Sequence, residues 1–104
     1  PMKKIVLFCS AGMSTSLLAT KMQKSAKDKG IEVSIETLPE AQMEKRIDDD
    51  VDVVLLGPQI RYALRRAKKL CDEKKIPVDV INSVDYGMVD GEKVLEKAIK
   101  MMKK

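Results

Sequence analysis

The chain has 104 residues, of which 44% are hydrophobic and 35% charged, a composition typical of one globular domain and not of a disordered segment. Its net charge of +4 comes from 20 basic and 16 acidic residues that are interleaved, and aromatic residues make up only 3%. We expect no nucleic-acid binding, because single-strand binders stack bases on aromatic side chains. No stretch reaches the roughly 20 apolar residues that span a bilayer, so we expect no membrane insertion and a cytoplasmic protein.

The residue types limit the chemistry further. The chain has no histidine and two cysteines, Cys9 and Cys71. The absence of histidine excludes histidine-based catalytic triads, histidine-ligated zinc and a phosphohistidine intermediate on this chain. Two cysteines are too few for a disulfide scaffold. A nucleophile, if there is one, must be another residue type.

The first half of the chain alternates between strand and helix patterns. Residues 4–8 form a continuous apolar strand, and 14–29 read as a helix that ends before Gly30. Ser14 and Thr15 are its N-cap candidates. The expected buried stripe of this helix consists of Leu17, Leu18 and Met22. Residues 31–38 alternate as a half-exposed edge strand does, and 40–47 read as a short helix after Pro39.

The second half continues the same alternation. Residues 51–56 are the most apolar segment and read as a central strand buried on both faces. A helix follows from Gly57-Pro58, with an apolar face that runs from Ile60 to Cys71 and places Cys71 in the core. Its charged positions are expected to be solvated helix surface: Arg61, Arg65, Arg66, Lys68 and Lys69. Residues 77–81 read as a fourth strand, 82–90 as a loop and 91–104 as a final helix.

This pattern predicts an α/β fold in one domain over residues 1–104. Strands separated by helices pair in parallel, and the order 2-1-3-4 places the two most apolar strands in the centre of an open four-stranded sheet with helices on both faces. That order has a switch point between the first and third strands, where ligands bind beyond the carboxyl ends. The residues expected there are Cys9 and those after it, Gly57-Pro58-Gln59, and Asn82-Ser83 nearby.

Cys9 ends the first strand and is followed by small and hydroxyl-bearing residues. Most cysteines after an apolar strand are small buried hydrophobes, and Cys9 fits that role too. Its position before a helix N-terminus favours a second role, because such sites stabilise thiolates and bind anions. Backbone amides around Gly12 can form an anion nest, and hydroxyls of the loop can donate to the anion or cap the helix.

A thiolate in an anion cradle suggests two chemistries. One is a low-molecular-weight phosphatase or arsenate-reductase-like enzyme, which needs an arginine six residues after the cysteine, where this chain has Thr15. Such an enzyme also needs an acidic residue as general acid, for which Asp85 and Asp90 are the candidates. The other is phosphoryl carrying, which suits a weaker clamp because the group must leave again. A small interaction domain with an inert cysteine is the third alternative.

Three blocks of the sequence carry a resemblance to a known family. Residues 8–18, FCSAGMSTSLL, resemble the active-site loop of the enzyme IIB components of the bacterial sugar phosphotransferase system, of the lactose, cellobiose and N,N′-diacetylchitobiose family. Residues 53–60, VVLLGPQI, and 86–91, YGMVDG, are similar to that family's second and third blocks. The resemblance covers nearly the whole chain and implies the same parallel fold.

The resemblance also implies a function. Family members take a phosphoryl group from a phosphohistidine of a IIA component and pass it to a β-linked disaccharide bound by the membrane component IIC. On this resemblance Cys9 is phosphorylated, no metal, nucleotide or other cofactor takes part, and the chain meets the inner face of the membrane only through IIC. We also expect the chain to be a monomer. The residues expected to hold the phosphate are Ser10, Ala11, Gly12, Met13, Ser14, Thr15 and Ser16. Gln59 and Tyr86 near the strand ends either contact a partner or only cap and pack.

Overall fold

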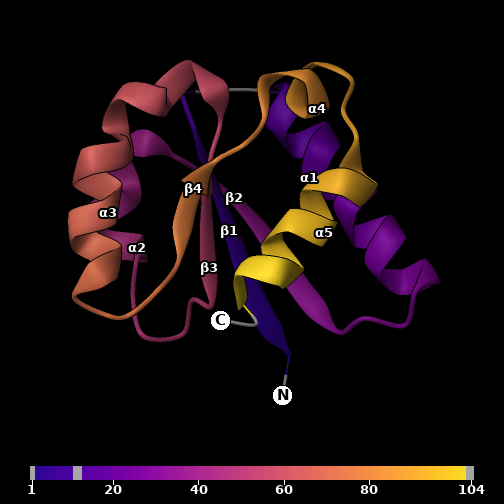
Figure 1. Cartoon of the computed structure of the whole chain (residues 1–104), viewed down its shortest axis with the longest axis horizontal. Helices are drawn as coiled ribbons and strands as arrows, with labels where there is room; N and C mark the ends of the chain where they lie inside the picture. Colours follow the sequence, from indigo (N-terminus) through magenta and orange to yellow (C-terminus); the bar gives the residue numbers. More distant parts are fainter. Residues whose placement is uncertain (1, 11–12, 103–104) are drawn as a thin grey trace.

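The centre of the molecule is a parallel four-stranded sheet with the order β2-β1-β3-β4, as the sequence predicts (Figure 1). The computed structural model describes residues 2–10 and 13–102. The strands are β1 (Lys3–Cys9), β2 (Val33–Pro39), β3 (Val53–Leu56) and β4 (Val78–Val80). β2 lies at one edge of the sheet and β1 and β3 lie in its centre, which confirms the places expected for residues 31–38 and 51–56.

Helices cover both faces of this sheet. One face carries α1 (Met13–Asp28), α4 (Ser83–Gly87) and α5 (Gly91–Met102), and the other carries α2 (Met43–Arg46) and α3 (Leu64–Asp72) (Figure 1). Two 3₁₀ segments, Glu40–Gln42 and Pro58–Ala63, lead into α2 and α3. Within residues 2–10 and 13–102, none of the helices is both long and apolar enough to cross a membrane.

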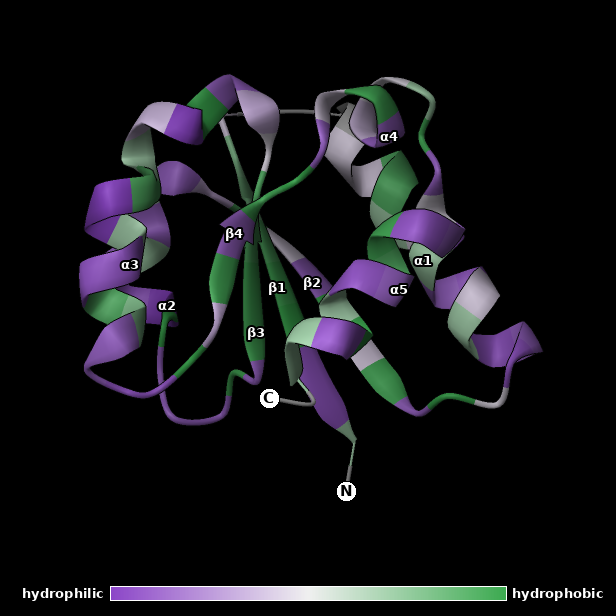
Figure 2. Cartoon of the chain, in the orientation of Figure 1, coloured by the Kyte–Doolittle hydropathy of each residue, from purple (hydrophilic) through white to green (hydrophobic). Residues whose placement is uncertain are grey.

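The side chains of β1 alternate between two cores. Val6 and Phe8 pack on the side of α2 and α3, and Ile5 and Leu7 pack on the side of α1 and α5; all four are fully buried. Figure 2 shows the same arrangement as apolar strands between helices whose outer faces are polar. Burial of each such side chain stabilises the fold by roughly 1.5–3 kcal/mol. β1 therefore contributes to both cores at once.

Helix α1 differs from its prediction at its beginning and matches it at its end. It begins at Met13, upstream of Ser14 and Thr15, so the prediction that these residues are N-cap candidates is wrong. Leu17 is 49% exposed and not buried as expected, because the buried stripe runs through Leu18, Met22 and Ala26, about 100° away around the helix.

The end of α1 is a Schellman motif built on Gly30. This glycine has a φ of +68°, and its N–H donates to Lys27 O at 3.2 Å. The N–H of Ile31 donates to Ala26 O at 2.8 Å, which completes the motif. The prediction of a glycine just beyond the helix end is confirmed, since the left-handed conformation is strained for residues with a side chain.

The helices around β3 and β4 confirm one prediction and correct another. The apolar face of residues 60–71 is buried as expected, through Ile60, Ala63, Ala67 and Cys71. The loop expected over residues 82–90 is wrong, because residues 83–87 form α4. The Asn82 side chain caps this helix by accepting hydrogen bonds from the backbone N–H groups two and three residues on, at 2.9 and 3.0 Å.

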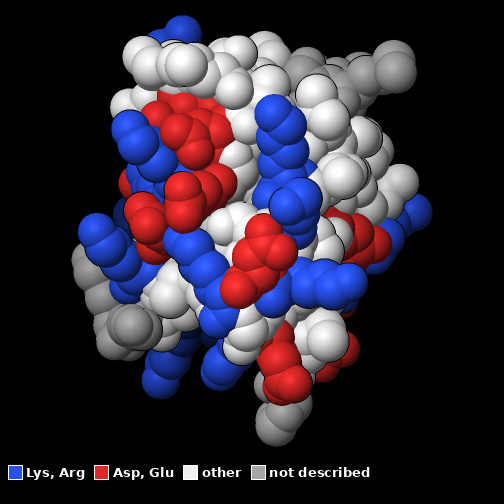
Figure 3. All heavy atoms as spheres, turned by 90° about the vertical axis from the view of Figure 1, so that its right-hand side faces the viewer, with Lys and Arg blue, Asp and Glu red and all other residues white. Residues whose placement is uncertain are grey.

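Charges of both signs are mixed on the face that carries α1 and α5 (Figure 3). Lys29 pairs with Glu92 at 2.9 Å and with Glu96 at 3.6 Å, and its hydrogen bond with Glu92 is the main cause of its raised pKa. The expected solvated positions of α3 and the segment before it are all exposed, and Arg66 Nε lies 3.0 Å from Glu44 Oε2. Acidic and basic residues, which are interleaved in the sequence, are therefore also mixed on both of these surfaces.

Gly91 permits the closest approach between α1 and α5. A side-chain carbon at this position would lie 2.6 Å from both Lys21 C and Met22 N, which are backbone atoms of α1. Real contacts of this kind are far longer, so the two helices must move apart if Gly91 gains a side chain. The packing of α5 on α1 therefore depends on a glycine here.

We expect Gly91→Ala to destabilise the protein by about 1–3 kcal/mol, because the added methyl group overpacks the α1–α5 contact. Gly87→Ala is the matched control, since nothing lies within 4 Å of a side-chain carbon at Gly87. Chemical denaturation of both variants measures the difference. Equal stabilities of the two variants would contradict this account of the helix contact.

Candidate functional site

The carboxyl ends of the central strands meet at one edge of the sheet. Cys9 is paired with Pro39 at the end of β2, and Phe8 is paired with Leu56, the last residue of β3. Leu56 is in turn paired with Val80 at the end of β4. The chain therefore leaves all four strands at this edge, and the crevice predicted between the first and third strands is where Cys9 lies.

Cys9 lies between the ends of β2 and β3. The residue is 6% exposed, and its Sγ lies 3.9 Å from Leu38 O, at the limit of a weak thiol hydrogen bond. On the other side, Gly57 N–H donates to Phe8 O at 2.8 Å, and a side-chain carbon at Gly57 would lie 3.7 Å from Cys9 Cβ. Gly57 thus follows β3 directly beside the cysteine.

The N-terminus of α1 supplies a field that favours an anion at this edge. The helix has 16 residues, carries no acidic residue in its first turn and begins four residues after Cys9, at Met13. The aligned peptide dipoles of a helix place positive partial charge at its N-terminus. Ser10 and Ser16 are both exposed. Of the predicted phosphate-binding residues, Ala11 and Gly12 lie outside the described residues, as do the side chains of Met13 and Ser14.

The structure brings three of the predicted site residues together through their side chains. Thr15, from α1, is fully buried, and its Oγ1 lies 2.7 Å from the hydroxyl oxygen of Tyr86, from α4. Gln59 Nε2 donates to the same Tyr86 oxygen at 3.2 Å. A side-chain carbon at Gly57, beside Cys9, would lie 2.9 Å from Gln59 Oε1, so this cluster adjoins the cysteine.

Helix α4 holds Tyr86 in place by caps at both ends. Beyond its C-terminus, Asp90 N–H donates to Asp85 O at 2.8 Å, and Val89 adopts a φ of 51°. This left-handed conformation costs a β-branched residue roughly 1–2 kcal/mol. Val89 is packed against the core on the α1 and α5 side, and this packing offsets the cost. The position of Tyr86 is thus set by a short helix that the sequence pattern did not reveal.

Cys71 is a core residue, as predicted. It is fully buried on α3, and burial raises the pKa of its thiol to about 11. Both cysteines of the chain are free thiols. Cys71 therefore stays protonated at neutral pH and is not a nucleophile in the folded protein.

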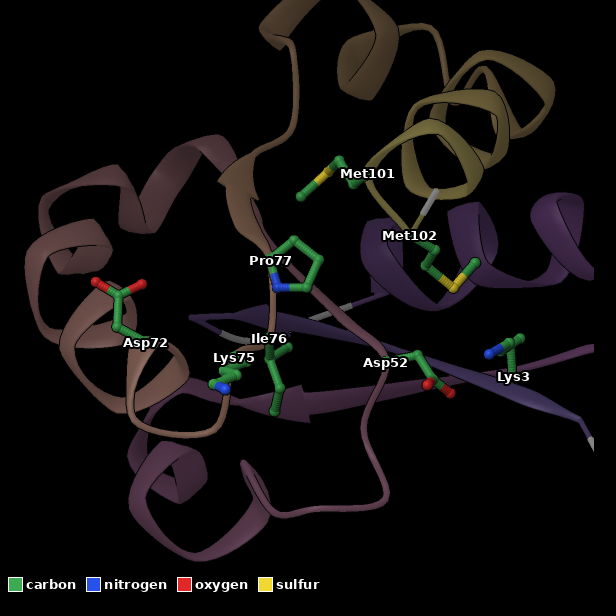
Figure 4. Close-up of a pocket in the computed structure, with 8 residues that line it drawn as sticks. All are labelled: Lys3, Asp52, Asp72, Lys75, Ile76, Pro77, Met101 and Met102. Atoms are coloured by element: carbon green, nitrogen blue, oxygen red, sulfur yellow. The ribbon is translucent and has the colours of Figure 1, made fainter. Parts of the chain in front are cut away.

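A hollow of about 510 Å³ opens at the opposite end of the sheet (Figure 4). Lys3, at the start of β1, Asp52, just before β3, and Pro77, just before β4, line it together with Met101 and Met102 of α5. It is separated from Cys9 by the full length of β1. No cluster of three or more metal-binding side chains occurs among residues 2–10 and 13–102, in this hollow or elsewhere.

The fold and the position of Cys9 define a small α/β domain with one candidate thiol at its switch point. The family described as "PTS system, Lactose/Cellobiose specific IIB subunit" matches residues 4–97. The chain belongs to this family of phosphotransferase-system components, which confirms the resemblance of its three sequence blocks.

Individual relatives are IIB components of the same system. The chain is 42% identical over 101 residues to the oligo-beta-mannoside-specific EIIB component of Bacillus subtilis, with 97% of each chain covered. It is 41% identical over 104 residues to the cellobiose-specific EIIB component of Lactococcus lactis subsp. lactis, with 96% of each covered. Among solved structures, the cellobiose-specific phosphotransferase IIB component from Borrelia burgdorferi is 42% identical with a TM-score of 0.80, covering 99% of this chain and 94% of that one.

We expect Cys71 to resist alkylation by iodoacetamide in the folded protein at about pH 8, because it is buried and protonated. Peptide mapping before and after unfolding in guanidinium measures this. Burial raises the pKa of the Cys71 thiol from its ordinary value of 9.0 to about 11, so this thiol contributes its full stabilisation of the fold below pH 9.0. The contribution is lost as the pH rises toward 11. Modification of Cys71 at equal rates in the folded and unfolded protein would contradict this assignment.

Proposed function

We propose that this chain carries a phosphoryl group on Cys9 between two partners of a sugar phosphotransferase system. The observation that carries the proposal is the position of Cys9, at the carboxyl end of β1 and before the N-terminus of α1, in a chain of the IIB family. The donor is a phosphohistidine of a IIA component. The acceptor is a hydroxyl of a β-linked disaccharide held by the membrane component IIC, at the inner face of the membrane.

Two displacements at phosphorus make up the proposed reaction. In the first, the Cys9 thiolate attacks the phosphorus, the P–N bond to the donor imidazole breaks, and the imidazole nitrogen keeps the electron pair. In the second, the sugar oxygen attacks, the S–P bond breaks, and Cys9 leaves as a thiolate. The proton of the sugar hydroxyl is released. Cys9 thus ends each cycle in the state in which it began, and no oxidant or cofactor is needed.

The surroundings of Cys9 support holding a phosphoryl group. The positive end of α1 and the backbone N–H groups of residues 10–16 are the proposed ligands of the phosphoryl oxygens, with the hydroxyls of Ser10, Ser14, Thr15 and Ser16. A phosphoryl group adds about two negative charges, which the acid-free first turn of α1 accommodates.

Phosphatase chemistry lacks its arginine here, and one of its two candidate general acids is engaged elsewhere. A phosphatase loop places an arginine where this chain has Thr15, whose hydroxyl is engaged with Tyr86. Of the two candidate general acids, Asp90 accepts a hydrogen bond from Lys93 N–H at 3.1 Å and so caps the start of α5. We therefore propose that water does not efficiently release the phosphoryl group and that a sugar does.

On this proposal, the chain does not determine which sugar receives the phosphoryl group. The relatives named for oligo-beta-mannoside and for cellobiose are 42% and 41% identical to this chain, over almost equal lengths. Equal similarity to relatives named for different sugars fits a component that handles the phosphoryl group while IIC binds the sugar.

Incubation with phosphoenolpyruvate, enzyme I, the histidine phosphocarrier and a IIA component of the lactose/cellobiose class should add one phosphoryl group to the chain, as intact mass spectrometry measures. Cys9→Ser should gain none, because serine at that position is a much weaker nucleophile. Cys71→Ser is the matched control and should be labelled like the wild type. Labelling that survives in Cys9→Ser and disappears in Cys71→Ser would reverse the assignment.

Apolar side chains around the candidate site favour a docking surface for the two partners. Val84 of α4 and Met88, which directly follows that helix, are 67% and 74% exposed and about one helical turn apart, and Tyr86 lies between them in sequence. Leu17 of α1 is 49% exposed but lies about 200° around the helix from Thr15, which contacts α4, so it is not part of this pair. An exposed apolar pair is typical of interaction surfaces. We propose that IIA and IIC cover this patch in turn.

We expect Met88→Glu to slow phosphoryl transfer from the IIA component by roughly tenfold, because a charge replaces an apolar contact at the proposed interface. Met2→Glu is the control, since Met2 is 61% exposed but precedes β1 at the opposite end of the sheet. Initial rates of labelling at several IIA concentrations measure the effect. Equal rates for the two variants would contradict a docking role for α4.

A further inference from the structure

The cluster of Gln59, Tyr86 and Thr15 joins three elements that are far apart in the sequence. Gln59 lies in the 3₁₀ segment after β3, Tyr86 on α4 and Thr15 in the first turn of α1. Their polar atoms form a chain, from Gln59 Nε2 to the Tyr86 hydroxyl at 3.2 Å and from that hydroxyl to Thr15 Oγ1 at 2.7 Å. The chain ends at a fully buried hydroxyl beside the loop that follows Cys9.

The protons along this chain have a preferred direction. An amide nitrogen donates and does not accept, so the Tyr86 oxygen is the acceptor of the bond from Gln59. A phenol is more acidic than an aliphatic alcohol, so in the bond between Tyr86 and Thr15 the phenol is the better donor. With Tyr86 donating, the proton of the Thr15 hydroxyl is left for another acceptor.

The position of Thr15 in α1 decides where that proton is directed. Inside a helix, a threonine hydroxyl donates to the carbonyl four residues earlier, as Thr20 does to Ser16 O at 3.0 Å. The helix starts at Met13, and the residue four positions before Thr15 lies outside the described residues. Among residues 2–10 and 13–102, Tyr86 is the one hydrogen-bond partner of the Thr15 hydroxyl. An anion bound in the loop after Cys9 would be an acceptor for the remaining proton.

We propose that Gln59 and Tyr86 are positioning residues that act on the phosphoryl group through Thr15. The inference rests on the proposed function and deepens it. Gln59 donates to Tyr86, Tyr86 donates to Thr15, and Thr15 donates to a phosphoryl oxygen on Cys9. Hydrogen bonds in such a chain polarise one another, so each upstream donor strengthens the last one.

We call this chain of hydrogen bonds, from Gln59 through Tyr86 to Thr15, the relay. It ends at Thr15, the position where a phosphatase has its arginine. An arginine would add a full positive charge and two parallel hydrogen bonds to the phosphoryl group. A neutral hydroxyl, strengthened by two upstream donors, holds the group less tightly and leaves it transferable to a sugar. Neither Gln59 nor Tyr86 needs to touch the phosphoryl group for this effect.

If Tyr86 acts through Thr15, the effect of removing its hydroxyl must depend on Thr15. A direct contact between Tyr86 and the phosphoryl group would have no such dependence. Tyr86→Phe should lower the phosphorylated fraction at equilibrium with the IIA component by about threefold to tenfold, because the last hydrogen bond is weakened. Thr15→Val should lower it at least as much, and Thr15→Ser should restore it. In a Thr15→Val background, Tyr86→Phe should have no further effect, since its route to the phosphoryl group is gone.

The pKa of the phosphoryl group provides a second readout, which a change in folding alone does not move. Titration of the phosphorylated protein followed by ³¹P NMR should show this pKa rise by about 0.5 or more in Tyr86→Phe, because weaker donation favours the protonated phosphoryl group. Tyr62→Phe is the matched control. Tyr62 is the chain's other tyrosine, 71% exposed, and bonded to Glu40 at 2.7 Å.

The outcomes separate the two proposals. Wild-type protein that gains no phosphoryl group on Cys9 contradicts the proposed function itself. Wild-type protein that is labelled on Cys9, while Tyr86→Phe matches Tyr62→Phe in both readouts, overturns the relay alone. An effect of Tyr86→Phe that persists at full size in the Thr15→Val background also overturns the relay, because Tyr86 then acts without Thr15. Loss of the Tyr86 effect in that background, with rescue by Thr15→Ser, supports it.

Discussion

The placement of β1 in the middle of the sheet is the constraint on which the candidate site depends. This strand pairs with β2 on one edge and β3 on the other, and the side chains of Ile5–Phe8 fill both cores. A shift of its register by one residue would exchange the two sets of side chains between the faces. The strand is therefore fixed along its length, and the position of its last residue, Cys9, is fixed with it.

The groups around Cys9 come from elements that lie beside β1 or follow it in the chain. Gly57 follows β3 beside the cysteine, and α1 begins just beyond it with its positive end toward the same edge. Thr15 and Tyr86 then tie α1 to α4 by a hydrogen bond between residues 71 positions apart. On the proposed function, neutral donors around Cys9 suit temporary storage of a phosphoryl group, since a stronger cationic clamp would also stabilise hydrolysis. The second cysteine plays no part, because its burial keeps it protonated.

The strand order was predictable from the sequence, and the details of the site were only partly so. Two apolar runs, residues 5–8 and 53–56, can be buried on both faces only in the middle of a parallel sheet, a condition that the order 2-1-3-4 satisfies. The same reasoning places Cys9 at the edge where ligands bind. Family resemblance added the partners and the phosphoryl chemistry, which hydrophobic periodicity does not contain.

Helix α4 and the side-chain cluster were missed for physical reasons. A helix of five residues is too short to show a periodic stripe, and α4 is held by the Asn82 cap and by contacts with distant elements. The Asn82-x-x-Asp85 spacing, with a capping residue and an acid three positions later, was the available signal. Leu17 was misplaced because the buried stripe of α1 runs through Leu18, Met22 and Ala26, about 100° around the helix from Leu17. No local pattern indicates that Thr15, Gln59 and Tyr86 meet.

The central claim is that the chain's phosphoryl group is bonded to sulfur. ³¹P NMR of the protein after phosphoryl transfer from a IIA component tests this most directly, since phosphorus bonded to sulfur resonates apart from phosphorus bonded to oxygen. The account predicts one resonance of the phosphorothiolate type, absent in Cys9→Ser. A resonance of a phosphate ester on serine, threonine or tyrosine, or no resonance while the IIA component is fully phosphorylated, would contradict it.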